Sequence, residues 1–178
     1  MSKFACALAR VMTIAAVMCA AQTASAKTAG WDQVANIKEA ATHLGKIQKR
    51  QGATKAFDFI IACYKTQGLA SKYSKYFEAC IAQDYIHTQT LALIYSRLAP
   101  DALKKLRVPT PQQLSQAMGQ RVTVAFQKYS ISVAEAEAFK KLVDKYGFPT
   151  FASIVFPKGV KSGDSQDDAK DSEKNGTP

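Results

Sequence analysis

The sequence predicts an all-α protein: a small antiparallel bundle of four to five helices with one helix-hairpin disulfide and a disordered C-terminal tail. Three observations support this. Apolar residues recur every three or four positions over long stretches between residues 31 and 146. Recognisable capping residues and helix breakers separate these stretches. The connections between them are short, which favours antiparallel neighbours.

The first two predicted helices cover residues 31–50 and 55–66 and are separated by Gly52. Both show the spacing of one buried helical face. A third helix is predicted to begin after Ser71 as its N-cap and to run to about residue 98. Residues 101–107 are expected to add one short turn before the next long helix.

Two further helices have strong start signals. Thr110 as N-cap with Pro111 at the first helical position predicts a fourth helix. Ser132 followed by Glu135 is a capping box and predicts a fifth helix, which Gly147 and Pro149 are expected to end. The segment Phe151-Ala-Ser-Ile-Val-Phe156 is rich in strand formers, and we expect it to lie extended across the bundle because one strand cannot form a sheet.

The first 26 residues have the pattern of a secretory signal peptide. Lys3 and Arg10 precede an uncharged, mostly apolar run, and Ala24-Ser25-Ala26 is a small-x-small cleavage site. We therefore expect cleavage after Ala26 and a periplasmic or secreted protein. After that point the sequence contains no apolar stretch that approaches the roughly 20 residues of a transmembrane helix.

The remaining chain divides into a helical domain, residues 27–157, and a tail, residues 158–178. The tail contains five acidic residues, four lysines and few apolar residues, so it is predicted to be disordered. The helical domain contains 18 Lys and Arg residues against nine Asp and Glu residues. Such a basic surface favours anionic partners, although many exported proteins are basic simply for solubility.

Two cysteines, Cys63 and Cys80, remain after the predicted cleavage. An oxidising compartment favours a disulfide between them, which would join the second and third helices if these form a tilted or staggered hairpin. Their spacing does not suit a redox pair, and a zinc site that used both thiolates with His43 or His87 would have no recognised ligand spacing. No metal and no cofactor is expected.

The third and fourth helices each place one charged residue on an apolar face. Asp84 lies in the stripe of the third helix, with His87 and Thr88 near its edges, and Arg121 lies in the stripe of the fourth. Isolated buried charges are costly, so we expect Asp84 and Arg121 to pair, with His87 or Thr88 supplying further hydrogen bonds. The group would then be either a structural network or the wall of a ligand pocket.

Lysines and tyrosines alternate around the predicted connection between the second and third helices. Such residues can bind a sugar, a phosphorylated ligand or a protein partner, because a ring stacks while an ammonium group meets an anion. Alternatively, the tyrosines pack the hairpin and the lysines only solubilise it. The candidate binding residues are Lys65, Lys72, Tyr73, Lys75 and Tyr76.

These features predict an exported, non-enzymatic protein that binds an envelope protein or an anionic envelope component. The alternative is a small-molecule carrier with a pocket near Asp84, His87 and Arg121. Nucleic acid is not an expected partner for an exported chain without a recognition motif. The chain has only two histidines and no nucleophile or metalloprotease motif, so enzymatic activity is not expected.

Overall fold

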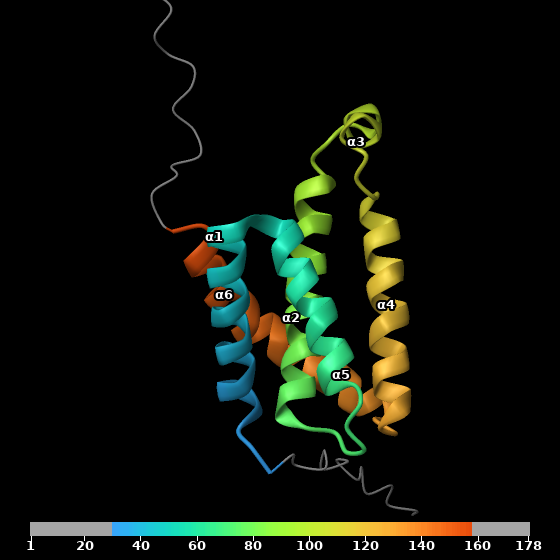
Figure 1. Cartoon of the computed structure of the whole chain (residues 1–178). Helices are drawn as coiled ribbons and strands as arrows, with labels where there is room; N and C mark the ends of the chain where they lie inside the picture. Colours follow the sequence, from blue (N-terminus) through green and yellow to red (C-terminus); the bar gives the residue numbers. More distant parts are fainter. Residues whose placement is uncertain (1–29, 158–178) are drawn as a thin grey trace, which may run out of the picture.

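The computed structural model describes residues 30–157, and the predicted signal peptide and tail lie outside this range. Within the described range the chain forms α-helices and one π-helical turn, which confirms the predicted all-α fold (Figure 1). The elements are α1 (Gln33–Gln67), α2 (Lys75–Tyr95), α3 (Pro100–Leu106), α4 (Pro111–Lys128), α5 (Val133–Leu142), η1 (Val143–Gly147) and α6 (Phe148–Val155).

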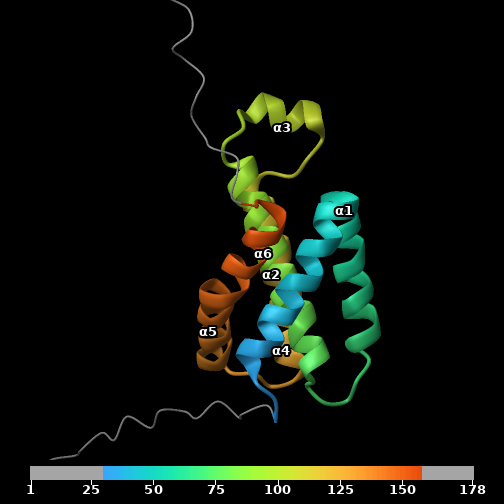
Figure 2. The same ribbon diagram turned by 90° about the vertical axis from the view of Figure 1, so that its left-hand side faces the viewer.

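Helix α1 folds back on itself at Gly52. This residue has φ 85° and ψ 173°, a conformation open to glycine but strained for other residues. The rings of His43 and Phe59, one from each half, have centroids 4.8 Å apart. Figure 2 shows the two halves running in opposite directions. The two helices predicted on either side of Gly52 are therefore the two halves of α1.

Helix α2 is the centre of the bundle and packs against α1, α4 and η1. Its apolar residues meet those of α1, α4, α5, η1 and α6 in one continuous core. Helix α4 packs mainly on α2, and α5 continues directly into η1 and packs its Phe139 edge to face on Phe126 of α4. The short α3 lies beyond one end of the bundle, between α2 and α4 (Figure 1).

The predicted helix starts are mostly found. Thr110 and Ser132 cap α4 and α5 with complete capping boxes. The cap of α2 is Ser74, not Ser71, and its side chain accepts a hydrogen bond from the Phe77 amide. The ring of Tyr73, the residue before this cap, packs against Trp31 and Tyr129.

The prediction of an extended segment at residues 151–156 is wrong, because most of this segment belongs to α6. The predicted helix end at Gly147 and Pro149 is also wrong. The chain passes through the π-helical turn η1 and resumes with Pro149 in the first turn of α6, where a missing N–H costs no intrahelical bond. A Cβ atom at Gly147 would lie 2.9 Å from Ile86 Cδ1, so glycine here serves close helix packing.

The predicted disulfide between Cys63 and Cys80 is present. It joins the second half of α1 to α2 with a Cα–Cα distance of 5.7 Å. The bond closes a loop with a sequence separation of 17 residues that includes the whole connection between the two helices. The disulfide therefore fixes the position of this connection relative to the bundle.

Replacing both cysteines by alanine should lower the free energy of unfolding by about 3 kcal/mol, because the unfolded chain regains loop entropy. Urea denaturation followed by circular dichroism measures this change. A reducing agent should destabilise the wild-type protein by a similar amount and leave the double variant unaffected. Equal stability of the oxidised wild type and the variant would contradict the prediction.

Candidate functional site

Asp84 and Arg121 form a bidentate ion pair in the core between α2 and α4. The Arg121 Nε donates to Asp84 Oδ2 at 2.9 Å, and its Nη2 donates to Oδ1 at 2.7 Å. The Asp84 side chain has no exposed surface, whereas that of Arg121 is 27% exposed. The pairing expected from the sequence is present, and the charged hydrogen bonds raise the pKa of Arg121.

Two hydroxyl groups complete the shell of Asp84. Tyr64 donates to Oδ2 at 3.2 Å from the second half of α1, and Thr88 donates to Oδ1 at 3.1 Å from one turn along α2. Burial, with the nearby Asp84 carboxylate, raises the pKa of Tyr64, so its phenol stays protonated and donates. The sequence identified Thr88 as a possible partner of Asp84 but did not identify Tyr64.

His87 is buried beside this network but faces other groups. Its Nδ1 lies 3.1 Å from Gln48 Oε1, and its ring stacks on Phe57 at 6.0 Å between centroids. The Arg121 guanidinium lies 5.4 Å from the centroid of the same Phe57 ring. Burial lowers the pKa of His87 to about 4, so the imidazole is neutral at pH 7.

A second buried acid, Glu78, was not recognised as a core residue from the sequence. It has no exposed surface and accepts hydrogen bonds from Trp31 Nε1 at 3.0 Å, Gln33 Nε2 at 2.8 Å and Asn36 Nδ2 at 3.0 Å. In the sequence, Glu78 resembles an ordinary acidic residue in the first turn of a helix. Its role depends on donors more than forty positions away, which local pattern does not show.

One pocket, of about 540 Å³, lies where the N-terminus of α1 and the α1–α2 and α4–α5 connections meet. We name it the aromatic pocket. The rings of Trp31, Tyr73 and Tyr129 line it together with the lysines Lys72 and Lys128 and the carboxylate of Glu135. Lys128 Nζ also donates to the Gly68 carbonyl, and the Tyr129 hydroxyl donates to the Ala70 carbonyl at 2.9 Å. These bonds hold the α1–α2 connection against the end of α4.

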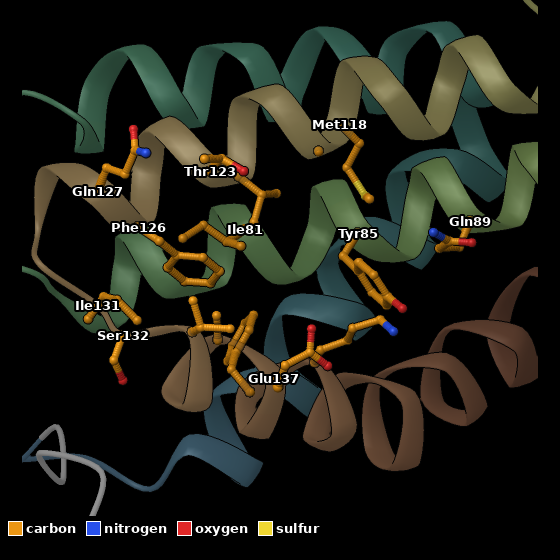
Figure 3. A pocket seen from close by; sticks show the side chains of 16 residues that line it. Ile81, Tyr85, Gln89, Met118, Thr123, Phe126, Gln127, Ile131, Ser132 and Glu137 are labelled. Carbon is orange, nitrogen blue, oxygen red and sulfur yellow. The ribbon is translucent and has the colours of Figure 1, made fainter.

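A second pocket, of about 420 Å³, is a groove between α4 and α5 with α2 as its floor (Figure 3). We name it the apolar groove. Ile81 and Tyr85 from α2, Met118 from α4 and Phe139 from α5 are among the apolar side chains that line it. Neither pocket is lined by Asp84, His87 or Arg121. These three side chains contact Tyr64, Gln48 and Phe57 instead, so neither of these two pockets is the one that the carrier hypothesis expected.

The structure separates the five candidate binding residues into smaller groups. Lys72 and Tyr73 line the aromatic pocket. Lys75 Nζ lies 5.1 Å from the ring centroid of Tyr76, which is 60% exposed at the start of α2. Lys65 belongs to the last turn of α1. The sequence missed Trp31, Lys128 and Tyr129, which join Lys72 and Tyr73 only through the tertiary fold.

Comparison with protein-family profiles, with curated proteins and with solved structures finds no match for this chain. Within residues 30–157 no cluster of His, Cys, Asp and Glu side chains could hold a metal ion. The same part of the chain contains no helix that is long and apolar enough to cross a membrane. The functional argument therefore depends on the geometry of the two pockets.

Arg121→Met should destabilise the protein more than Asp84→Asn. The first change leaves a fully buried carboxylate without its cation and should cost about 3–5 kcal/mol. The second leaves an arginine that reaches water and an amide that still bonds its neighbours, at a cost of about 1–3 kcal/mol. Urea denaturation of both variants measures the difference, and the reverse order would contradict this description of the pair.

The stability of the protein should fall as the pH is lowered from 6.5 toward 4. Over this range His87 becomes protonated in the unfolded state, whereas the buried imidazole of the folded state stays neutral. The full loss from this residue is about 3 kcal/mol. His87→Asn, which retains an amide donor for Gln48, should reduce the slope of the unfolding free energy over this range. An unchanged slope in the variant would show that His87 does not cause the pH dependence.

Proposed function

We propose that this protein is an exported, non-enzymatic binding protein that holds an anionic component of the cell envelope in the aromatic pocket. The component carries a phosphate or carboxylate group on a small polar body such as a sugar. One observation carries the proposal: two lysines and three aromatic rings from three separate parts of the chain line one cavity of about 540 Å³.

The pocket has the chemistry that such a ligand needs. The ammonium groups of Lys72 and Lys128 can meet the anion, while the rings of Trp31, Tyr73 and Tyr129 offer faces for the sugar. The carboxylate of Glu135 accepts hydrogen bonds from the backbone and hydroxyl of Ser132, so part of its charge is used within the α5 capping box. The volume lies within the range of roughly 300–1,000 Å³ of small-ligand sites.

The net positive charge of the helical domain also favours an anionic ligand. Residues 27–157 contain twice as many basic as acidic residues, 18 against nine. Two of the nine acidic residues, Glu78 and Asp84, are completely buried and contribute little negative charge to the surface. The field around the protein therefore attracts anions, and this attraction weakens as salt is added.

Export is supported by the signal-peptide pattern in residues 1–26 and by the disulfide. Disulfides persist in periplasmic and extracellular compartments and are rare in the cytosol. The non-enzymatic part of the proposal is supported by the absence of a nucleophile or metalloprotease motif in the sequence. One of the two histidines, His87, is only 2% exposed and contacts Gln48 and Phe57.

Binding can be followed through Trp31, the only tryptophan of the chain, which lines the aromatic pocket. Titration with glucose 6-phosphate should change its fluorescence, with an affinity that falls as sodium chloride is added. Uncharged glucose should bind much more weakly. The double variant Lys72→Glu, Lys128→Glu should bind glucose 6-phosphate about tenfold more weakly or worse, because two charged contacts become repulsive.

The matched control is Lys104→Glu, Lys105→Glu. It changes the net charge equally, but the two residues lie on α3, outside the aromatic pocket. This control should retain binding. An equal loss of affinity in both double variants would show that the effect comes from the net charge of the protein and not from the aromatic pocket. Absence of any binding of glucose 6-phosphate to the wild-type protein would reject the proposed function.

A further inference from the structure

We propose that the ligand of the aromatic pocket is a single-chain amphiphile whose alkyl chain lies in the apolar groove. Its anionic head group would meet Lys72 and Lys128, and its chain would run between α4 and α5 (Figure 3). This inference rests on the proposed function and adds the class of ligand to it.

The apolar groove has the shape of a chain-binding site. Ile81, Tyr85 and Gln89 recur every fourth residue along α2 and form a floor about 12 Å long. Met118 and Val122 from α4 form one wall, and α5 forms the other. A void with apolar walls favours a flexible hydrocarbon, because burial of each methylene group releases hydration water.

The charged residues that line the apolar groove, Glu137 and Lys140, do not make it a site for an ion. They lie three residues apart on the same helix face, where opposite charges offset each other. The Lys140 Nζ also lies 5.9 Å from the ring centroid of Tyr85. The groove therefore suits the uncharged part of a ligand, and the charged part must be bound elsewhere.

The two pockets meet at a common wall. Phe126, Ile131 and Phe139 line both of them. The rings of Phe126 and Phe139 have centroids 6.1 Å apart and pack edge to face. Ile131 lies in the α4–α5 connection, at the end of the groove in Figure 3. A ligand that spans the two pockets past Ile131 would thus place its alkyl chain in the apolar groove and its head group in the aromatic pocket.

Gly119 offers a way to fill the groove without disturbing the fold. It lines the groove from α4, and an added Cβ atom would meet no other atom within 4 Å. Val122 and Thr123, three and four residues further along the helix, line the same groove, so a side chain at position 119 would project from that face. Gly119→Leu also replaces a poor helix former by a good one.

The test uses monoalkyl phosphates of increasing chain length, each below its micelle concentration, with binding measured by calorimetry. Octyl phosphate should bind more tightly than butyl phosphate, by up to roughly fourfold for each added methylene group that is buried. Gly119→Leu should remove this gain and leave the affinity for butyl phosphate unchanged. Ala117→Leu, which adds the same side chain at an exposed position of α4 outside the groove, should retain the gain.

Thr123→Phe provides a second groove-filling variant at an exposed position, so the result does not depend on one substitution. Thermal melting confirms that each variant is folded. Equal affinity for butyl and octyl phosphate, or a chain-length gain that survives both groove variants, would overturn the inference. So would binding to anionic vesicles or to an apolar peptide with none to the monomeric phosphates.

The two proposals fail in different ways. If glucose 6-phosphate and butyl phosphate bind through Lys72 and Lys128 but chain length has no effect, the proposed function stands and the amphiphile is rejected. If uncharged octyl glucoside binds as tightly as octyl phosphate, and the Lys72→Glu, Lys128→Glu variant binds both normally, the anionic head group is rejected along with the aromatic pocket.

Discussion

The arrangement of the bundle depends on two carboxylates that α2 carries into the core. Glu78 and Asp84 are both fully buried, and a buried carboxylate must be hydrogen-bonded or paired. Their partners come from different neighbours: the start of α1 for Glu78, and the end of α1 together with Arg121 of α4 for Asp84. The side chains that satisfy these two acids therefore also set where α1 and α4 lie along α2.

Trp31 connects the buried Glu78 to the aromatic pocket. Its indole N–H donates to Glu78, while its ring lies 6.1 Å from that of Tyr73 and lines the pocket. On the opposite side, Tyr129 packs against Tyr73 and bonds the α1–α2 connection. The disulfide anchors both helices that flank this connection. The pocket is thus built on loops, but a buried polar network and a covalent bond hold these loops in place.

The sequence predicted the features that depend on residues close together in the chain, such as helix caps, and the disulfide, which an oxidising compartment favours. The helix caps at Thr110 and Ser132, the disulfide and the all-α class are confirmed. Residues 151–156 were misjudged because their strand-forming composition is outweighed by packing of α6 on α1. Lys128 and Tyr129 of the aromatic pocket escaped prediction because they lie about 60 positions from the α1–α2 connection that they contact.

The apolar groove depends on the same buried acid as the bundle. The Asp84–Arg121 pair joins α2, which forms the floor of the groove, to α4, which forms one wall. The other wall, α5, continues into η1, whose Val143 and Gly147 are buried against the core. A substitution that separates Asp84 from Arg121 would therefore also change the width of the groove, although neither residue lines it.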